Sequence, residues 1–344
     1  MYGADEFPAD IKIKFPSTPV YTFEAFLALG EAVPDSELVA RAALQKPGHT
    51  CTLIYTSGTT GPPKTVMITH DNITWTVRAM IATLLGGKVD NSDHIVSFLP
   101  LSHVAAQMLD LHLPVCSGTQ CHFAQPDALK GTLGMTLQTA RPTIFFGMPR
   151  VWENIYDRLQ QLRADKKGMK KALASWVKTK AMKHWESREF GATGVSAPIG
   201  YRVVHKLLRK VHVALGLDRC SAFFVGAAPI EVKILKYFSS IDIPIMEIFG
   251  QSECTGPHAC NYLEAFKFGS VGRPLLPGTE TKLGVDNSEL CYRGRRIFAG
   301  YMKMKEETKK TVDSKGWLHS GDVVKVREDT CNCAFFRPPV MLLT

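Results

Sequence analysis

The chain has 344 residues, of which 45% are apolar and 21% charged, and its formal net charge is +9. These values are typical of a globular protein with room for about two or three domain-sized cores. No apolar run approaches the ~18 residues of a membrane-spanning helix, which argues against an integral membrane protein.

The first residues and the cysteines indicate a reducing environment. Residues 1–6 are polar and acidic, unlike a secretory signal. Nine cysteines are scattered without a Cys-x-x-Cys pair, and we interpret the close pair Cys331 and Cys333 as accidental rather than as a metal site. Because an odd number of cysteines in a long chain without a signal is typical of reduced thiols, we expect a cytoplasmic protein.

Apolar runs and helical patterns alternate along much of the chain. We expect helices over residues 22–30, 70–85 and 127–139, and strands over residues 51–55, 95–99, 143–147, 221–225 and 245–249. Residues 151–217 are expected to be mainly helical and basic, and frequent Gly and Pro after residue 270 indicate short antiparallel strands. The alternation predicts an α/β fold with mostly parallel sheets flanked by helices, and a small β-rich part near the C-terminus.

The most informative stretch follows the first predicted strand. It consists of Thr56, Ser57, Gly58, Thr59, Thr60, Gly61, Pro62, Pro63 and Lys64. Small residues leave backbone N–H groups free to form a nest for anions, and the closing lysine adds one compact positive charge. The common P-loop is excluded because it has four residues between its glycines and a glycine before its lysine, whereas here two residues separate Gly58 from Gly61 and Pro63 precedes Lys64. An ordinary surface loop is the alternative, but strand, paired glycines and lysine together favour polyphosphate binding.

Four later segments carry residue types suited to the same chemistry. They are Leu99-Pro100-Leu101-Ser102-His103, Gly226-Ala227-Ala228-Pro229, Phe249-Gly250-Gln251-Ser252-Glu253, and Trp317-Leu318-His319-Ser320-Gly321-Asp322. Glu253 is a hard oxygen ligand of the kind that Mg²⁺ takes beside phosphates, and the alternative is a solvated loop carboxylate. Asp322 suits a ribose diol because a carboxylate accepts hydrogen bonds from two hydroxyls. The alternative is that Asp322, which follows Ser320 and Gly321, only helps to form a turn.

In this order the motifs closely resemble the signature of adenylate-forming enzymes. Strings at residues 69–75, 99–108 and 127–133 further resemble bubblegum-type long-chain acyl-CoA synthetases. The resemblance implies catalytic roles for Lys64, Glu253 and His103, with Mg²⁺ on Glu253 and His103 at the mouth of the acyl pocket. It implies nucleotide contacts from residues 56–64 and from Gly226, Ala227, Glu247, Ile248, Phe249, Gly250, Gln251, Ser252 and Asp322.

The resemblance also implies a two-step reaction. A long-chain fatty acid and ATP would form acyl adenylate and pyrophosphate, and coenzyme A would then take the acyl group and release AMP. Residues 1–50 would be a remnant of the N-terminal region, residues 51–328 a partial AMP-binding domain and residues 329–344 a divergent tail.

The chain departs from the family pattern at three places. Thr65 stands where the family has glycine, and Asn287 interrupts a Gly-Glu-Leu turn. After Asp329 no Gly-Arg-x-Lys hinge or C-terminal lid domain is found, so we expect a chain truncated at both ends with impaired activity. The alternatives are a non-catalytic isoform or decoy that binds nucleotide or acyl chains, and, less favoured, an enzyme that activates aryl or amino acids.

The positive charge is concentrated between Arg158 and His212. Apolar residues from Met169 to Trp185 recur on one helical face with lysines around them, which predicts a core-packed helix with a basic rim. The sharper alternative is peripheral contact with an anionic membrane surface, such as the endoplasmic reticulum or another intracellular membrane. The positive charge alone would allow nucleic acid binding, but the sequence contains no recognition motif for it. We therefore expect no nucleic acid partner.

Overall fold

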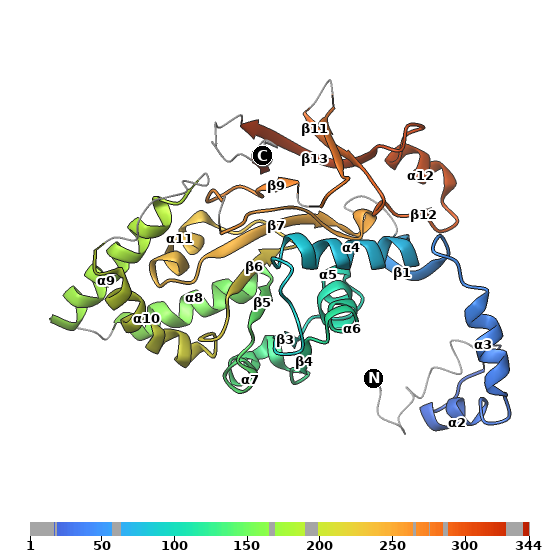
Figure 1. Ribbon diagram of the computed structural model, residues 1–344, viewed down its shortest axis with the longest axis horizontal. Coiled ribbons are helices and arrows are strands. Elements are labelled where there is room, and N and C mark those ends of the chain that lie inside the picture. Colours follow the sequence, from blue (N-terminus) through green and yellow to red (C-terminus); the bar gives the residue numbers. More distant parts are fainter. Residues whose placement is uncertain are drawn as a thin grey trace. The chain divides into compact units, whose positions relative to one another are not determined.

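The computed structural model describes residues 17, 19–56, 63–164, 169–189, 199–263, 266–274, 276–284, 288–327 and 340–343 (Figure 1). The chain divides into two compact units, Met1–His49 and Thr50–Thr344. No helix in the described part of the chain is long and apolar enough to cross a lipid bilayer.

The first unit is a pair of short helices, α2 (Phe23–Ala28) and α3 (Asp35–Ala43). Thr22 caps α2 by accepting a hydrogen bond from the Ala25 N–H at 3.1 Å, which confirms the predicted threonine cap. None of the described residues in this unit is buried. The unit therefore has no core of its own among these residues.

The second unit contains a five-stranded sheet in the order β5-β6-β7-β8-β9. The strands β5 (Ile144–Gly147), β6 (Ala222–Gly226) and β7 (Ile245–Gln251) are parallel, and β8 (Gly256–Cys260) and β9 (Arg273–Pro274) extend the sheet in antiparallel fashion. A separate parallel pair joins β3 (His94–Ser97) to β4 (Gln120–Phe123). The expected parallel strands of an α/β core are present, in a mixed five-stranded sheet and a separate parallel pair.

Antiparallel strands form the remaining sheets, as the sequence predicts for the C-terminal part. One sheet joins β1 (Thr50–Thr56), β2 (Lys64–Thr69) and β12 (Gly300–Tyr301). The other has the order β10-β11-β13-β14, from β10 (Glu280–Leu283), β11 (Glu289–Arg293), β13 (Leu318–Arg327) and β14 (Val340–Leu343). Residues from the two ends of the second unit thus meet where β12 pairs with β2.

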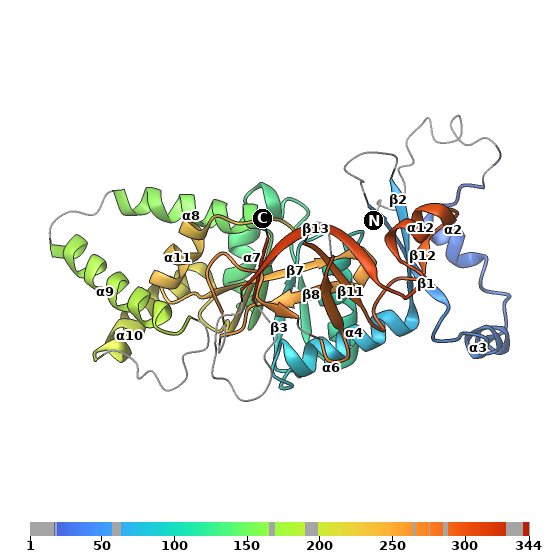
Figure 2. The ribbon, with the colours of Figure 1, turned by 90° about the horizontal axis from the view of Figure 1, so that it is seen from above.

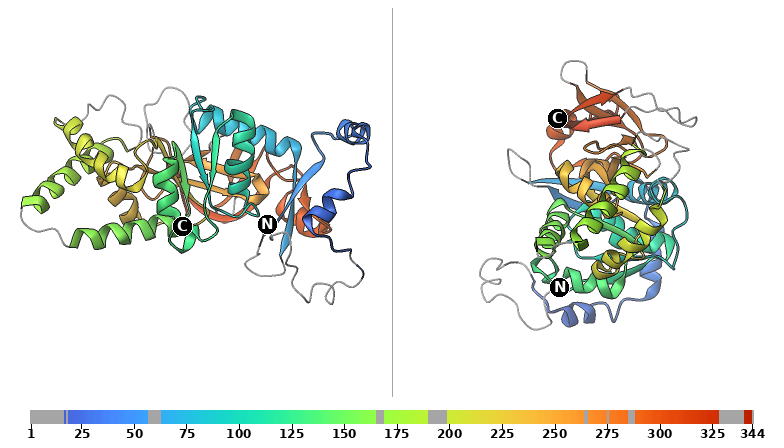
Figure 3. Two further views of the ribbon diagram at one scale, coloured as in Figure 1. Left: turned by 90° about the horizontal axis from the view of Figure 1, so that it is seen from below. Right: turned by 90° about the vertical axis from the view of Figure 1, so that its left-hand side faces the viewer.

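The basic segment folds into α8 (Pro149–Ala164), α9 (Met169–Glu186) and α10 (Tyr201–Leu215), as expected. These helices and α11 (Val232–Ser240) lie together in the views of Figure 2 and Figure 3. Other helices in the described part of the chain include α4 (His70–Thr83), α5 (Val104–Ala106), the π-helix η1 (Gln107–His112), α6 (Leu113–Ser117), the 3-10 turn η3 (Ser252–Cys254) and α12 (Lys305–Thr311).

Two sequence-based expectations need correction. The prediction of one continuous helix over residues 127–139 is wrong. The segment forms a 3-10 turn, η2 (Ala128–Lys130), and a separate helix, α7 (Leu133–Ala140). Gly131 between them has φ of 141°, a conformation that ends a helix and that glycine tolerates best. The apolar face of α9 is buried only in its second half: Val177, Ala181 and Trp185 are buried, while Ala172, Leu173 and Trp176 are exposed.

Trp152 on α8 is the centre of the core behind the parallel strands. Its side chain is fully buried, and its ring meets Phe145 and Phe238 edge-on at centroid distances of 5.2 and 5.1 Å. Its indole N–H donates to the Phe224 carbonyl oxygen at 3.1 Å. This one side chain thereby packs α8 against β5, β6 and α11.

We expect Trp152→Ala to lower the free energy of unfolding by about 3–5 kcal/mol, because it leaves a large cavity among aromatic rings. Trp152→Phe keeps most of the apolar volume and loses mainly the hydrogen bond, so we expect a loss of about 1–2 kcal/mol. Urea denaturation followed by far-UV circular dichroism measures both. Equal losses for the two variants would contradict the packing role.

Candidate active site

Two of the predicted site segments, residues 226–229 and 249–253, lie at the carboxyl ends of two parallel strands. Gly226 at the end of β6 pairs with Ile248 of β7, so Ala227 and the residues Gln251 to Glu253 emerge at the same edge of the sheet. In open α/β sheets this edge is where ligands bind. Residues twenty or more positions apart are thus brought to one place by strand pairing alone.

Ala227 has a strained backbone at this edge. Its φ is 71°, in the left-handed region, and its side chain is exposed. For a residue with a Cβ this conformation costs about 1–2 kcal/mol. Strain of this kind is concentrated at binding sites, which supports placing a ligand against the Gly226–Ala227 turn.

Gln251 joins this edge to β13. Its side-chain amide nitrogen donates to Asp322 Oδ2 at 2.7 Å and to the Ser320 carbonyl oxygen at 2.8 Å, and its amide oxygen accepts from the Tyr292 hydroxyl at 2.7 Å. Two site residues predicted from separate motifs, Gln251 and Asp322, are therefore in direct contact. Burial raises the pKa of Asp322 above its ordinary value, the hydrogen bond from Gln251 opposes this rise, and the charge of Glu289 adds to it.

Tyr301 links two of the three predicted catalytic residues, Lys64 and Glu253. Its hydroxyl donates to Glu253 Oε1 at 2.8 Å, and the Lys64 ammonium lies 5.0 Å from the centre of its ring. Lys64 also forms an ion pair with Glu307 at 3.3 Å. A cation over an aromatic face is weakly attracted to it, so Tyr301 positions both Lys64 and Glu253.

Glu253 is suited to a divalent cation. Its side chain is half-buried at the sheet edge, and in the described part of the chain no lysine or arginine forms an ion pair with it. A carboxylate oriented by one hydroxyl and left without a cationic partner fits Mg²⁺, which is commonly bound through one or two carboxylates plus phosphate oxygens.

The glycine-rich loop lies largely outside the described residues, because its members 57–62 are not among them. Its two ends are described: Thr56 pairs with Lys64 across β1 and β2, and the Thr56 hydroxyl donates to the Lys64 carbonyl oxygen at 3.3 Å. Thr65 lies in β2 without a positive φ, and its carbonyl accepts from the Met302 N–H at 2.9 Å. The Cβ that distinguishes Thr65 from glycine is therefore accommodated without strain.

His103 occupies a different position. Its Nδ1 accepts from the Ala105 N–H at 3.1 Å and caps α5, and burial lowers the pKa of its imidazole. An apolar pocket adjoins this turn and is lined by Ile95, Val96, Phe98, Leu99, Ala105, Ala106, Leu109, Asp110, Ile144 and Phe146. No hydrogen bond or ion pair of the described residues joins His103 to Lys64 or Glu253.

The remaining predicted nucleotide contacts lie along β7 and just after it. Phe249 is buried in the core with its ring 6.3 Å from that of His258, whereas Gly250 is exposed and Ser252 begins η3. Ile248 is half-buried. Glu247 accepts from the Gly269 N–H at 3.1 Å, and burial raises the pKa of its carboxyl to about 8.

Sequence reasoning missed Tyr301, Tyr292 and Glu307. They lie in segments where the chain shows no motif, and they reach the site only because β12 pairs with β2 and because Tyr292 on β11 faces the end of β7. The one available signal was the position of Tyr301 in the short apolar stretch from Ile297 to Met302, which indicates a strand but no partner.

A model of the family described as "AMP-binding enzyme" matches residues 9–302. The chain belongs to the AMP-binding enzyme family. It is 44% identical over 330 residues to the long-chain-fatty-acid–CoA ligase ACSBG2 of Gallus gallus, a match that covers 94% of this chain and 43% of that protein. For ACSBG1 of Rattus norvegicus the identity is 38% over 317 residues, covering 90% and 43%. These relatives confirm the bubblegum-type resemblance, and the chain spans less than half of their length.

Solved structures confirm the fold. The o-succinylbenzoate CoA synthetase MenE of Bacillus subtilis in complex with AMP matches with a TM-score of 0.60 and 17% identity, over 87% of this chain and 50% of that one. Apo MatB of Rhodopseudomonas palustris matches with a TM-score of 0.59 and 19% identity, over 87% and 48%. At such identities the likeness concerns the architecture of the AMP-binding enzymes alone.

Glu247 predicts a measurable pH dependence of stability. Its pKa in the folded chain, about 8, is higher than the ordinary value of 4.5, so the folded state holds the proton more tightly. The resulting stabilisation is full below pH 4.5 and is lost as the pH rises through 8. Each pKa unit corresponds to about 1.4 kcal/mol in the free energy of unfolding. Because Glu247→Gln cannot ionise, we expect it to avoid at least ~2 kcal/mol of the stability that the wild type loses as the pH rises, and to be more stable than the wild type above pH 8.

Urea unfolding at a series of pH values between 5 and about 9 provides the measurement. The exposed Glu306 supplies the matched control, since Glu306→Gln should leave the pH profile unchanged. A Glu247→Gln profile that runs parallel to the wild-type profile would show that this carboxyl has no such role.

Proposed function

We propose that this chain binds ATP and activates a long-chain fatty acid as its acyl adenylate, that coenzyme A then takes the acyl group, and that the chain on its own does so slowly. The observation that carries the proposal is the pair of contacts at one sheet edge, Gln251 with Asp322 and Tyr301 with Glu253 and Lys64. They gather the motif residues that the family resemblance assigns to ATP.

The chemistry needs alignment and charge stabilisation rather than a protein nucleophile. A carboxylate oxygen of the fatty acid attacks the α-phosphorus of ATP, and the bond to the β-phosphate breaks to release pyrophosphate. The thiol sulfur of coenzyme A then attacks the acyl carbon, and AMP leaves. Negative charge grows on phosphate oxygens in the first step, where backbone N–H groups of residues 56–61 and the Lys64 ammonium would stabilise it.

Each remaining residue has a binding role in this proposal. Gln251 holds one oxygen of Asp322, which orients the carboxylate toward the ribose hydroxyls. Tyr301 orients Glu253, whose carboxylate would hold Mg²⁺. When bound, Mg²⁺ neutralises part of the phosphate charge.

The fatty acid is proposed from the names of the relatives. The cavity next to the α5 turn is lined mainly by apolar side chains, Leu99, Leu109 and Phe146 among them, but its free volume of about 20 Å³ holds about one water molecule, so it would have to widen to take an alkyl chain. The imidazole of His103 is half-buried, which lowers its pKa; it caps this turn and would position the carboxyl end of the acyl chain.

The ion pair of Lys64 with Glu307 supports the slow rate. The Lys64 ammonium must leave the Glu307 carboxylate before it can contact a phosphate of ATP. Part of the free energy of ATP binding is therefore used to break this ion pair. The same observation favours the second candidate, a non-catalytic protein that holds nucleotide or acyl chains. The two candidates differ in a single measurable step, the reversible formation of acyl adenylate.

We expect Lys64→Ala to weaken Mg-ATP binding by about ten- to a hundredfold, because a charge-assisted contact contributes roughly 1.5–3 kcal/mol. Glu307→Gln removes the competing carboxylate and should strengthen binding instead. Equilibrium dialysis with labelled ATP measures both. Weaker binding in both variants would show that Glu307 supports the fold of the site rather than competing with phosphate.

Palmitate-dependent exchange between pyrophosphate and ATP separates the two candidates. Slow exchange that is lost in Lys64→Ala supports the enzyme, and ATP binding without exchange supports the holding protein. Exchange at the rate of a complete synthetase contradicts the proposed slow turnover, and absence of ATP binding contradicts both candidates.

We also propose peripheral contact of α10 with an anionic membrane surface. Val203 and Leu207 are exposed on this helix beside Lys206, Arg209 and Lys210, so apolar and basic groups share its outer side. We expect flotation with vesicles that contain anionic lipid and none with neutral vesicles. Lys206→Glu combined with Arg209→Glu should abolish flotation, and binding that ignores lipid charge would rule out this surface.

A further inference from the structure

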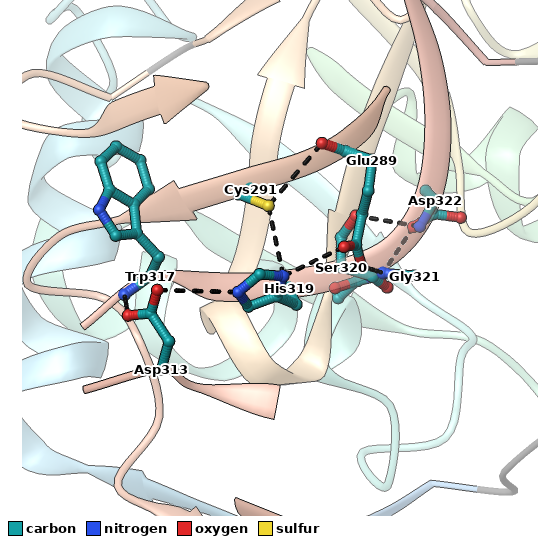
Figure 4. A network of polar contacts seen from close by, with 9 residues as sticks. Glu289, Cys291, Asp313, Trp317, His319, Ser320, Gly321 and Asp322 are labelled. Atoms are coloured by element: carbon teal, nitrogen blue, oxygen red, sulfur yellow. Dashed lines mark hydrogen bonds and ion pairs between the residues drawn. The ribbon is translucent and has the colours of Figure 1, made fainter. Parts of the chain in front are cut away.

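A cysteine, a histidine and a glutamate meet between β11 and β13, apart from the ATP-site residues. Cys291 and His319 are directly opposite each other in the antiparallel ladder, and Glu289 lies two positions before Cys291, across a register irregularity. Figure 4 shows the three side chains directed toward one another. The arrangement combines thiol, imidazole and carboxylate, the three ligand types that zinc uses in proteins.

The distances suit a single ion. Cys291 Sγ lies 3.5 Å from His319 Nδ1, and His319 Nδ1 lies 3.1 Å from Glu289 Oε2. One donor atom from each residue falls within 4.8 Å of the others. In a tetrahedral site with Zn–S of about 2.3 Å and Zn–N or Zn–O of about 2.0–2.1 Å, neighbouring donor atoms are about 3.3–3.6 Å apart. Two of the three separations therefore need almost no adjustment.

The second ring nitrogen of His319 also has a partner. His319 Nε2 lies 3.8 Å from Asp313 Oδ2, and the Asp313 carboxylate is itself held by the backbone N–H groups of Trp317 and Lys315 at 2.9 and 2.8 Å. Histidine ligands commonly direct their other nitrogen to a carboxylate, which fixes the ring orientation. In Figure 4, Asp313 lies on the side of the ring that faces away from Cys291.

The burial of the cluster leaves a route for the ion. Cys291 is buried, whereas His319 and Glu289 remain partly exposed, with side-chain exposures of 36% and 17%. An ion can thus enter from solvent and reach a sulfur that water reaches poorly. The open side leaves a fourth position for a water molecule.

We propose that Cys291, His319 and Glu289 bind a zinc ion, with water as the fourth ligand. Binding replaces the thiol proton of Cys291, which is released to solvent, so the ion is held by a thiolate, a neutral imidazole and a carboxylate. The ion joins β11 to β13 just before Ser320, Gly321 and Asp322. Its role is to fix the strand segment that carries Asp322.

This site differs chemically from the proposed Mg²⁺ position at Glu253. A thiolate is a soft ligand that favours zinc, whereas Mg²⁺ prefers oxygen ligands alone. Excess Mg²⁺ should therefore fail to displace the ion. The zinc site is argued from its own three side chains, and its metal binding can be tested without ATP.

The test uses the full 344-residue chain, reduced and stripped of metal with a chelator. We expect one zinc per chain in equilibrium dialysis, and with Co²⁺ a thiolate-to-cobalt charge-transfer band that zinc abolishes and millimolar Mg²⁺ does not. Cys291→Ser should lose the band, and His319→Gln should lower the affinity at least tenfold. Glu289→Gln should keep the band with weaker binding.

Matched cysteine variants provide the controls. Cys116→Ser removes an exposed thiol remote from the cluster, and Cys331→Ser with Cys333→Ser removes the close pair near the C-terminus; all should retain one zinc and the band. Absence of the band in the wild-type chain, or a band that persists in Cys291→Ser, overturns the proposal whether or not a variant folds poorly. Retained ATP binding beside a missing zinc would overturn the metal site and leave the proposed function intact.

Discussion

The side chain of Gln251 is the contact on which the candidate site depends. It uses both ends of its amide: the nitrogen donates to Asp322 and to Ser320, and the oxygen accepts from Tyr292. Each of these groups is partly or fully buried, and leaving one unpaired would cost about 1–3 kcal/mol. A residue with a shorter or charged side chain could not satisfy all three partners, so Gln251 sets the distance between β7 and β13 (Figure 2).

Tyr301 performs a comparable task for charges. Lys64 and Glu253 belong to distant parts of the sequence and form no ion pair with each other; the phenol between them offers a ring face to the cation and a hydroxyl to the carboxylate. Tyr301 thereby keeps Lys64 and Glu253 near each other without an ion pair between them. A site needs this spacing if phosphate and a metal ion are to lie between the two charged groups. Glu307 neutralises the charge of Lys64 in this structure through their ion pair.

Much of this arrangement could be predicted from sequence, for identifiable reasons. The strands ending at Gly226 and Gln251 are short apolar runs followed by small residues, a local signal, and parallel pairing then places their ends together. The contacts of Tyr301, Tyr292 and Glu307 depend on pairing between segments more than two hundred residues apart, or on a strand facing another sheet, and no local pattern encodes either. The helix over 127–139 failed differently, because its apolar period continues across Gly131 while the backbone does not.

Strand β13 carries residues of both proposed sites, His319 of the Cys291 cluster and Asp322 of the ATP site. His319 remains in the ladder opposite Cys291, whereas Gly321, with φ of 78°, turns the backbone so that the next residue, Asp322, reaches Gln251. The Gly321 N–H donates to Glu289 at 2.9 Å, so the turn is tied to the same carboxylate that completes the cluster. Any ligand that orders Glu289 and His319 restricts this turn as well. A metal ion at the proposed Cys291 site would therefore also restrict the position of the Asp322 carboxylate, through Ser320 and Gly321.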